Sequence, residues 1–329
     1  MRAVVVRAPG GIEALELIEL PQPQPGVGQV RVKAMAIGVG RPDALIRTGR
    51  YKWMPPLPAI PGNEIAGFVE ALGPGVTGVA VGDRVLLSSR ELPQRGGGYA
   101  EFACAPSDAL YPLPAVISFD DAVSLPNFQL AQALLFGCGG VEARSVLITG
   151  AAGGVASAMV QTARARGLRV IATARSAAKR GFALENGAHV ALDSSVSDLA
   201  DQVSASTHGL GVDLAVDPIG GTLFIACLNA LAPLGIAISY NIVAGPPAKD
   251  VFAELRSLLD RSLAVRTFSM HTLDGDPLRR RAFMQTAIDA MASGTVRVAR
   301  TTVLPLAEVR RAHQLLDATD TVGKLVLHP

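Results

Sequence analysis

The sequence predicts an α/β fold with two domains, one built on a doubly wound, parallel six-stranded sheet and the other mainly antiparallel and barrel-like. Three observations support this. The chain has 329 residues, which is long for a single hydrophobic core. Its first third alternates short β-rich runs with turn residues. From about Ser145 onward, β segments alternate with helical patterns instead.

The antiparallel domain is predicted from the short spacing between its strands. The β-rich runs of the first third are AVVV, ALELIEL, QVRVKAMAIG, IAGFVEAL, DRVLLS and YAEFACA. Turn-forming stretches separate them, namely PQPQPG, GPGVTG and QRGGG. Strands this short and this closely spaced are typical of an antiparallel, barrel-like domain.

The parallel sheet is predicted from the second half of the chain. The apolar run SVLITG leads into a helical pattern that ends near Gly167. Five more β segments follow with helices between them, namely LRVIATA, HVALD, VDLAVDP, GIAISYN and SLAVRTFSM. This alternation is the signature of a doubly wound sheet. The tail offers only two helices and two strands, so we expect it to pack on the first domain. The expected domains are 1–121 with 268–329, and 122–267.

Composition and charge exclude several classes of protein. The net charge of +2 gives no electrostatic footprint for nucleic acid or for an anionic membrane surface. No run of about 18 apolar residues is present, so no membrane-spanning helix is expected. The N-terminal apolar run is too short for a signal peptide. Cys104, Cys138 and Cys227 lie too far apart for a thiolate cluster, and a reduced, cytoplasmic setting is expected.

The strongest chemical signal is a loop of small residues after the strand Val146–Thr149. Missing side chains let the backbone approach a pyrophosphate, and the N-terminus of the following helix presents free N–H groups to its charge. Read against G-x-G-x-x-G, the loop has alanine at two of the three glycine positions. We predict a dinucleotide site; the alternative is a tight turn that binds nothing. The predicted site residues are Ala151, Ala152, Gly153, Gly154, Val155 and Ala156.

The end of the second parallel strand indicates which nicotinamide cofactor is used. An NAD site would offer Asp or Glu to the ribose hydroxyls there. This chain instead has Thr173, Arg175 and Ser176, followed by Lys179. Arg175, Ser176 and Lys179 would hold a 2′-phosphate, which favours NADPH. Alternatively, Arg175 and Lys179 form an ordinary solvated face.

The stretch PGNEIAG (61–67) raises a separate question. Glu64 stands between two glycines, and a carboxylate in this setting suits a metal neighbour, a catalytic base or a scaffold anchor.

Five stretches together resemble the medium-chain dehydrogenase/reductase superfamily, and within it the zinc-independent quinone oxidoreductase group. They are GNEIAGFVEALGPGVTGVAVGDRV (62–85), GGGYAEFACAP (96–106), ITGAAGGVASAMVQTARARG (148–167), VDLAVDPIGG (212–221) and the terminal GKLVLHP. The resemblance covers nearly the whole chain. It implies a Rossmann cofactor-binding domain and a GroES-like catalytic domain.

The resemblance also bears on the metal. Zinc alcohol dehydrogenases of the superfamily place a catalytic Cys and His at the positions that here hold Gly40 and Asn63. Glycine offers no ligand, and asparagine is a poor one beside imidazole or thiolate. The closely spaced cysteines of the structural-zinc lobe are absent as well. The expectation is catalysis without zinc, with Glu64 as a structural residue.

Zinc-free relatives reduce conjugated acceptors such as quinones, enones and enoyl thioesters. Hydride passes from the nicotinamide to the acceptor, and the protein positions the reactants and donates hydrogen bonds to the developing oxyanion. The resemblance implies that Tyr51 lines this cleft, either as a donor to the acceptor carbonyl or as an aromatic that holds a loop. Gly40 and Leu45 replace polar residues of typical members, which suggests a more apolar pocket.

Further candidates come from the ends of the fifth and sixth parallel strands. Tyr240 and Asn241 stand where a doubly wound sheet binds its ligand, and Phe268 is a weaker candidate. Relatives often form homodimers by pairing edge strands, and SLAVRTFSM and GIAISYN are apolar enough for this. The leading hypothesis is an NADPH-dependent reductase of a small-molecule quinone, enone or enoyl substrate. The alternative is a non-catalytic NADPH-binding protein with a structural or regulatory role.

Overall fold

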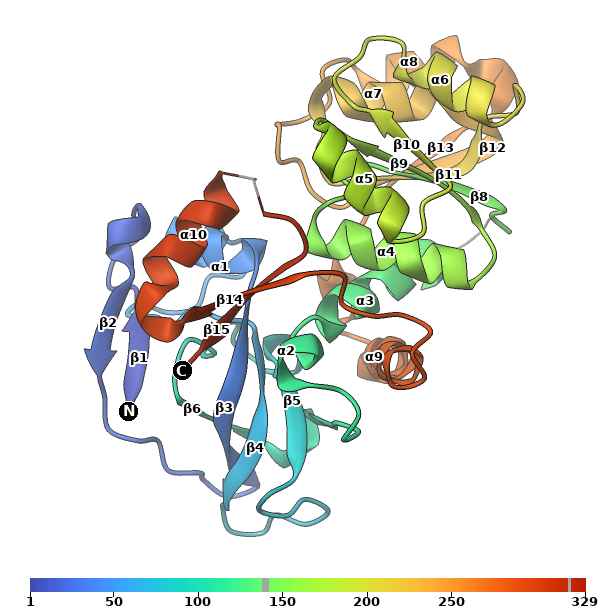
Figure 1. The fold of residues 1–329 in the computed structure, drawn as a ribbon. Helices are drawn as coiled ribbons and strands as arrows, with labels where there is room; N and C mark the ends of the chain where they lie inside the picture. Colours follow the sequence, from blue (N-terminus) through green and yellow to red (C-terminus); the bar gives the residue numbers. More distant parts are fainter. Residues whose placement is uncertain (138–141, 319–320) are drawn as a thin grey trace. The chain divides into compact units, whose positions relative to one another are not determined.

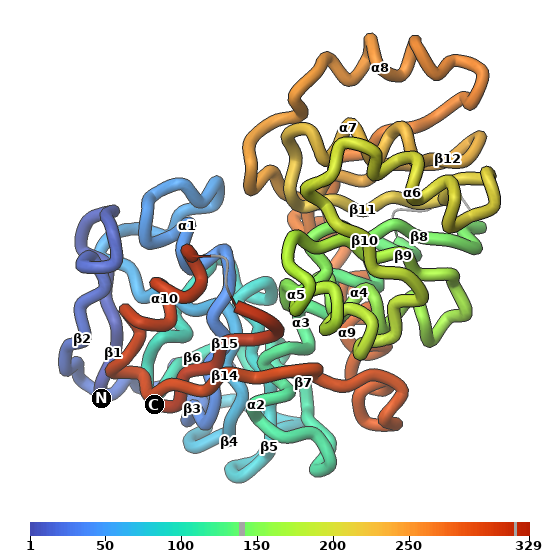
Figure 2. Tube along the Cα trace, turned by 45° about the horizontal axis from the view of Figure 1, so that its top comes forward, coloured from blue at the N-terminus to red at the C-terminus, as the bar shows by residue number. Residues whose placement is uncertain are grey.

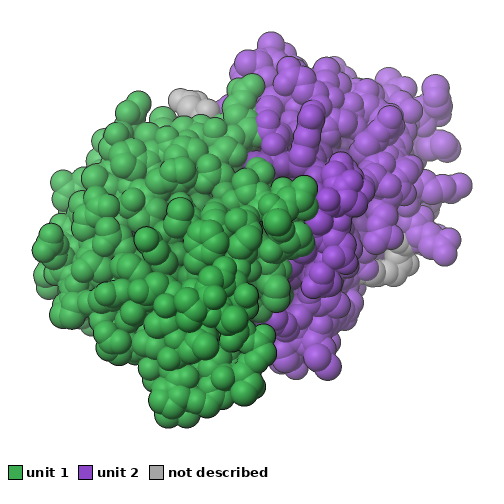
Figure 3. All heavy atoms as spheres, turned by 60° about the horizontal axis from the view of Figure 1, so that its bottom comes forward, with its two compact units in different colours: residues 1–126, 300–329 green, residues 127–299 purple. Residues whose placement is uncertain are grey.

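A computed structural model describes residues 1–137, 142–318 and 321–329, and Cys138 lies outside these ranges. The chain forms two compact units, which Figure 3 colours separately. Unit 1 contains residues 1–126 and 300–329, and unit 2 contains residues 127–299. Within the described ranges, no helix combines the length and the apolar content needed to cross a bilayer.

Unit 2 is built on a six-stranded parallel sheet with the strand order β10-β9-β8-β11-β12-β13. Every neighbouring pair in this sheet is parallel, as the sequence predicts. The order corresponds to the 3-2-1-4-5-6 arrangement of a doubly wound dinucleotide-binding sheet. The strands are β8 (Ser145–Ile148), β9 (Arg169–Ala174), β10 (Val190–Asp193), β11 (Val212–Asp217), β12 (Leu231–Ser239) and β13 (Ala264–Thr267).

Burial in this sheet follows strand position. The central strands carry near-continuous buried runs of branched apolar residues, for example Val146, Leu147 and Ile148 in β8, because helices cover both faces of a parallel sheet. Helices α4 and α5 cover one face, and α6, α7 and α8 cover the other (Figure 1). Their bounds are α4 (Gly154–Ala165), α5 (Ala177–Glu185), α6 (Leu199–Ser206), α7 (Gly221–Asn229) and α8 (Val251–Ser257).

Unit 1 is built on a seven-stranded, mainly antiparallel sheet with the path β14-β15-β3-β4-β5-β7, and β6 also pairs with β3. A separate antiparallel pair joins β1 to β2. Of the last two strands of the chain, β15 pairs antiparallel with β3, and β14 pairs parallel with β15 (Figures 1 and 2). The strands are β1 (Arg2–Val5), β2 (Glu16–Glu19), β3 (Gln29–Val39), β4 (Glu64–Leu72), β5 (Arg84–Ser88), β6 (Phe102–Pro106), β7 (Leu110–Pro112), β14 (Thr301–Pro305) and β15 (Lys324–His328).

One core unites the first and last parts of unit 1. Val4, Val32 and Leu87 share a buried cluster with Leu306 and Leu327 from the C-terminal segment. The C-terminal strands therefore complete the core of the N-terminal domain rather than forming a domain of their own. The remaining helices are α1 (Arg41–Arg47), α2 (Phe119–Ala122), α3 (Leu125–Gln132), α9 (Pro277–Ala292) and α10 (Val309–Asp317).

The segment 268–299, which the sequence analysis grouped with the antiparallel domain, belongs to unit 2. Its first residues form a small apolar cluster with the helical region before β8. Met270 and Leu273 are buried there against Ala133, and Phe268 and Phe283 pack on the same cluster. A buried amide adds to the connection, because Gln129 donates from Nε2 to the carbonyl oxygen of Arg280 at 2.9 Å.

Candidate functional site

The loop of small residues leaves the carboxyl end of β8, directly beside β11. Strand order reverses between these two strands, so a topological switch point lies here. The loop starts with Gly150 in a left-handed conformation at φ 63°. The Ala151 N–H donates to the Thr173 carbonyl at 3.0 Å, and the Gly153 N–H donates to the Gly150 carbonyl at 3.1 Å. The first bond holds the loop against the end of β9, and the second closes the loop on itself.

Helix α4 begins immediately after this loop without a side-chain cap. Gly153 is its N-cap, and the first turn contains no acidic residue. The N–H groups of Gly154, Val155 and Ala156 have no acceptor within the helix, so they carry the positive end of its dipole. Ala151, Ala152 and Ala156 are buried beneath, whereas Gly153 is exposed. The geometry is that of an anion site.

Gly153 is not required by the fold. It has no left-handed φ, and a Cβ built on it would meet only the Gly150 carbonyl oxygen, at 3.6 Å. An absent side chain here leaves open space above the helix N-terminus.

The turn after β9 holds the residues predicted to select the cofactor. Arg175 and Ser176 are exposed, and the Ser176 hydroxyl caps α5 by accepting from the Lys179 N–H at 3.3 Å. Thr173 is fully buried, and its hydroxyl has no hydrogen-bond partner among the described residues. Only its backbone carbonyl takes part in the loop, so its side chain does not reach the surface.

Two residues missed by the sequence analysis shape this turn. The Arg180 guanidinium donates to the Arg175 carbonyl at 2.9 Å and to the Asp193 carboxylate at 2.7 Å. Hydrogen bonds from Ser195, followed by the Arg180 charge, lower the pKa of Asp193. The end of the third strand, HVALD, therefore contributes a carboxylate that is engaged by Arg180 and Ser195. In the sequence, this carboxylate was recognisable as the aspartate that ends the run HVALD.

The loop after β11 (218–220) and the loop after β12 (240–250) are joined by hydrogen bonds, and we call the two together the platform. Asp217 is fully buried at the end of β11, where it accepts from the Thr149 hydroxyl and, at 2.6 Å, from the Gly220 N–H. Burial raises its pKa. Backbone bonds from Ala244 to Ile219 at 2.7 Å and from Tyr240 to Asp217 at 3.2 Å join the two loops.

The predicted residues of this platform have different surroundings. Tyr240 is partly exposed, and burial, followed by the Asp217 charge, raises its pKa. The Asn241 side chain accepts from the Ile242 N–H at 2.9 Å. Phe268 is tied by its N–H to the Ser239 carbonyl at 2.9 Å, and its ring packs in the apolar cluster of Met270.

In unit 1 a buried polar corner surrounds Asp43 on α1. This carboxylate is fully buried and accepts from the Gly40 N–H at 2.8 Å, the Gly62 N–H at 3.1 Å and the Asn63 side-chain amide at 2.6 Å. Burial, followed by the nearby Glu64 charge, raises its pKa from 3.8 to about 7. Sequence reasoning missed Asp43, which stands alone between apolar residues.

Glu64 is a scaffold residue in this corner. Its carboxylate pairs with the Lys324 ammonium of β15 at 2.8 Å, and both side chains are largely buried. The pair fills the space beside Gly38, where a Cβ would lie 2.2 Å from a Glu64 oxygen. Of the three roles open for Glu64 in the sequence, the anchor between β4 and β15 has a partner in the structure.

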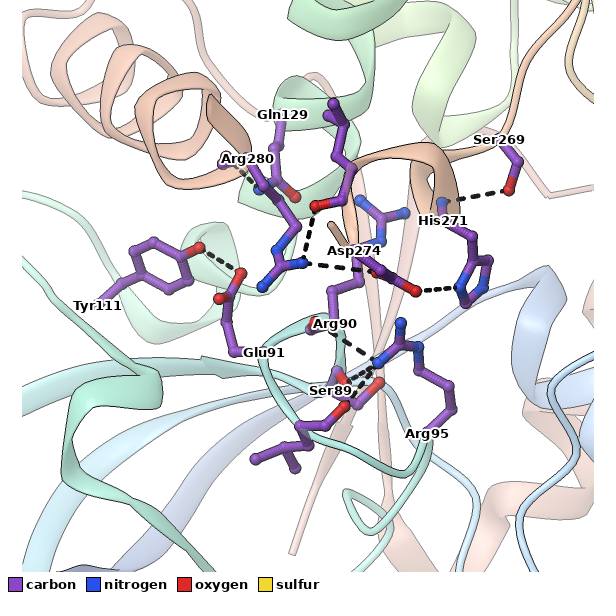
Figure 4. A network of polar contacts seen from close by, with 12 residues as sticks. Ser89, Arg90, Glu91, Arg95, Tyr111, Gln129, Ser269, His271, Asp274 and Arg280 are labelled. Carbon is purple, nitrogen blue, oxygen red and sulfur yellow. Dashed lines mark hydrogen bonds and ion pairs between the residues drawn. The ribbon is translucent and has the colours of Figure 1, made fainter. Parts of the chain in front are cut away.

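Tyr51 follows α1 and is partly exposed. Its ring contacts Trp53 edge to face, with 5.9 Å between the centroids. Burial raises its pKa, while the charges of Arg95 and Arg90 and a hydrogen bond with Arg95 oppose the shift. Arg95 is itself held by its loop, because Nη1 donates to the Ser89 carbonyl at 3.1 Å and to the Leu92 carbonyl at 2.6 Å (Figure 4).

A second buried chain of contacts in unit 1 was not predicted. The Tyr99 hydroxyl and His313 Nε2 are 3.0 Å apart, His313 Nδ1 is 3.1 Å from Arg47 Nη1, and Arg47 Nη2 donates to Asp317 at 2.7 Å. Burial, followed by the Arg47 charge, lowers the pKa of His313 to about 4. The imidazole is therefore neutral and joins α1, α10 and the segment before β6.

The corner around Asp43 does not offer a catalytic zinc its usual donors. Gly40 has no side chain, and Asn63 uses its amide N–H on Asp43 and its carbonyl oxygen on the Ser89 hydroxyl. Zinc prefers thiolate and imidazole ligands. Over residues 1–137, 142–318 and 321–329, no three His, Cys, Asp or Glu side chains gather as they would around a metal ion.

Comparison with known proteins identifies the family. Residues 26–115 match the family model described as alcohol dehydrogenase GroES-like domain, and residues 154–293 match the one described as zinc-binding dehydrogenase. Quinone oxidoreductase of Rattus norvegicus is 32% identical, with 99% of this chain and 97% of that protein covered. Synaptic vesicle membrane protein VAT-1 homolog of Homo sapiens is 31% identical, with 100% and 86% covered.

The fold agrees with a solved member of the same group. The Escherichia coli quinone oxidoreductase complexed with NADPH superimposes with a TM-score of 0.89 at 28% identity, and both chains are covered completely. The chain thus belongs to the medium-chain dehydrogenase/reductase superfamily, and within it to the quinone oxidoreductase-like group.

Proposed function

We propose that the protein is a zinc-free, NADPH-dependent oxidoreductase that transfers hydride to a quinone or to the activated C=C bond of an enone or enoyl thioester. The observation that carries the proposal is the uncapped N-terminus of α4 at the switch point, with exposed Arg175 and Ser176 at the end of the neighbouring strand. Relatives named quinone oxidoreductase, one of them solved with NADPH, support the cofactor and the reaction class.

The cofactor would be held by the backbone at one end and by charges at the other. The first-turn N–H groups of α4, from Gly154 to Ala156, suit the pyrophosphate. Arg175, Ser176 and Lys179 suit a 2′-phosphate, because a guanidinium and an ammonium give charge-assisted hydrogen bonds to phosphate oxygens. Asp193, the carboxylate at the end of the adjacent strand β10, is already engaged by Arg180, which reduces its repulsion of a phosphate.

The cofactor, once bound, supplies the hydride. The contribution of the chain is to orient the acceptor and to stabilise the negative charge that develops on its oxygen. We assign the hydrogen-bond donation to Tyr51, whose phenol lies in the field of two guanidiniums, Arg95 and Arg90. Platform residues Tyr240 and Asn241 would border the nicotinamide.

The reaction class is tested by mixing the protein with NADPH and a panel of quinones, enones and enoyl thioesters while following absorbance at 340 nm. We expect oxidation of NADPH with at least one class of acceptor, and weaker activity in Tyr51→Phe. NADPH binding without turnover on any acceptor would contradict the enzyme and favour a non-catalytic role.

Cofactor preference is tested separately by the variant Arg175→Gln with Lys179→Gln. Two charge-assisted contacts to the 2′-phosphate would be lost, at about 1.5 kcal/mol or more each, so NADPH affinity should fall at least about 100-fold. NADH affinity, measured in the same titration, should stay within about 2-fold because NADH lacks that phosphate. Equal losses for the two cofactors would reject the assignment.

We also propose a homodimer that forms through the outer edge of β13. This strand ends the sheet of unit 2 and is mostly exposed. An exposed sheet edge is a template for pairing with another chain.

A further inference from the structure

The polar corner of unit 1 holds Asn63 between the Asp43 carboxylate and the Ser89 hydroxyl. We propose that Asn63 is a positioning residue whose amide joins Asp43 to Ser89 and thereby fixes the place of Tyr51. The inference rests on the proposed role of Tyr51 in catalysis, but the contacts that carry it are independent of any ligand.

The orientation of Asn63 is set on both sides of its amide. Its N–H group donates to the Asp43 carboxylate at 2.6 Å, and its carbonyl oxygen accepts from the Ser89 hydroxyl. The Asn63 backbone carbonyl also accepts from the Ser89 N–H at 2.8 Å. One partner is an acceptor and the other a donor, so the side chain must present both, as an amide does. An aspartate of the same shape would present acceptors only.

On one side, the bridge reaches Tyr51 through α1. Asp43 accepts from the Gly40 N–H at 2.8 Å and from the Gly62 N–H at 3.1 Å, which ties the start of α1 to the segment before β4. Tyr51 follows the end of α1, and its N–H donates to the carbonyl of Leu45 in that helix at 3.2 Å. A displacement of Asp43 would therefore displace α1, and with it Tyr51, which is bonded to the end of that helix.

On the other side, the bridge reaches Tyr51 through the loop after β5. The Ser89 carbonyl accepts from Arg95 Nη1 at 3.1 Å, as Figure 4 shows. Arg95 also hydrogen-bonds with the Tyr51 phenol, and its charge opposes the rise in the pKa of Tyr51 more than that of Arg90 does. The contacts thus close a ring that runs from Tyr51 through α1, Asp43, Asn63, Ser89 and Arg95 and returns to Tyr51. Asn63 is the member that links the two halves.

The charges around the bridge predict how it responds to pH. Among the described residues, the titratable groups whose charges act on Asp43 include Glu64 on β4, Lys324 on β15, and Tyr51 and Tyr99 on loops. Asn63 is the uncharged neighbour that stabilises the Asp43 carboxylate by donating to it. In Asn63→Asp, two carboxylates would face each other, and they would hold together only while they share a proton. Raising the pH would then push them apart.

The sequence supplies a reporter for this movement. Trp53 is the single tryptophan of the chain and contacts the Tyr51 ring. Its fluorescence therefore reports on the surroundings of Tyr51 with neither cofactor nor substrate present. We expect the emission of Asn63→Asp to match the wild type near about pH 6 and to depart from it near about pH 9, where the shared proton is lost. Where the protein is active, kcat should fall in the same variant, by about 10-fold or more, over the same pH range.

The matched control is Asn186→Asp. Asn186 lies in unit 2, and its amide N–H donates to the Phe182 carbonyl at 2.7 Å, so this change also removes one amide donor. Its Trp53 emission should follow the wild type at every pH. Ser89→Ala, which frees the Asn63 carbonyl without adding charge, should shift the emission equally at both pH values and serves if Asn63→Asp does not fold.

Folded Asn63→Asp with wild-type emission across the range would overturn the proposal, as would unchanged emission in Ser89→Ala. Absence of reductase activity in the wild type would instead reject the proposed function, because the Trp53 measurement uses no substrate.

Discussion

At the scale of single residues, Gly153 separates the needs of the fold from the needs of the proposed cofactor. In Gly153→Ala the new methyl group would meet only the Gly150 carbonyl oxygen, at 3.6 Å, an ordinary contact. The melting temperature should therefore change little. NADPH affinity should fall at least about 10-fold, because the methyl group would stand where the pyrophosphate approaches the backbone.

Gly181→Ala is the matched control for Gly153→Ala. Gly181 lies within α5, and a Cβ there meets nothing within 4 Å. The change should leave NADPH affinity as it is and raise stability slightly, by about 0.5–1 kcal/mol, because alanine favours the helix. Unchanged NADPH binding in Gly153→Ala, measured by fluorescence titration, would remove the loop from the proposed site.

His313 makes the stability of unit 1 depend on pH. Its pKa is lowered from 6.5 to about 4 in the folded protein, so the unfolded chain takes up a proton first as pH falls. The stabilising contribution is complete above about pH 6.5 and is lost progressively as pH falls toward 4, up to about 3 kcal/mol in total. Arg47 can only donate, so Nδ1 accepts from it and Nε2–H donates to Tyr99.

His313→Gln tests this dependence. A glutamine amide can still accept from Arg47 and donate to Tyr99, but it does not titrate. The melting temperature of the variant should therefore fall less than that of the wild type between about pH 7 and about pH 4.5. His208→Asn, at an exposed position, serves as control. Parallel pH curves for wild type and His313→Gln would show that another group governs the loss.

At the scale of elements, the two loops of the switch-point platform depend on Gly220. Its φ is 78°, and a Cβ would lie 2.1 Å from the Gly245 carbonyl oxygen. Gly220→Ala should push apart the loops after β11 and β12 and lower stability by more than about 2 kcal/mol, the sum of backbone strain and overpacking. Cofactor binding should weaken with it, since the platform borders the proposed nicotinamide site.

Gly209→Ala isolates the clash from the strain. Gly209 has a similar φ of 85°, but a Cβ there meets nothing within 4 Å. The change should cost only about 1 kcal/mol, the strain of alanine in a left-handed conformation. Thermal unfolding of both variants gives the difference. Equal losses of stability in Gly220→Ala and Gly209→Ala would show that the contact with the Gly245 carbonyl adds nothing to the backbone strain.

Elements of regular structure were predictable because their signals are local. Alternation of β segments with helices predicted the parallel sheet, and strand order then followed as in other doubly wound sheets. The polar corners were not predictable in this way. Glu64 pairs with Lys324 and Arg47 contacts His313 across more than 250 positions of the chain. A single buried acid such as Asp43 has no periodic pattern, and its partners become visible only when strands pair.

At the scale of the whole molecule, the segment 268–299 belongs to unit 2, although the residues that follow it in the chain belong to unit 1. The C-terminal tail has too few elements to form a domain alone, so the whole of it was expected to pack on the antiparallel domain. Burial of Met270 and Leu273 against Ala133 connects the segment 268–299 to unit 2 instead. Apolar contacts that cross long stretches of sequence decide such boundaries, and hydrophobic periodicity does not show which core a helix will join.

The proposed dimer can be tested at one backbone N–H group of β13. Phe268 donates its N–H to β12, so by alternation the N–H groups of Ala264 and Arg266 face β12 and that of Val265 faces outward. Val265→Pro removes this outward donor and leaves the ladder to β12 in place. Sedimentation should show a dimer for the wild type and a monomer for Val265→Pro. Val265→Thr retains both the N–H and the branched side chain, so it should remain dimeric. A Val265→Pro protein that remains dimeric must be held together by another surface. A monomeric wild type would contradict the proposed dimer.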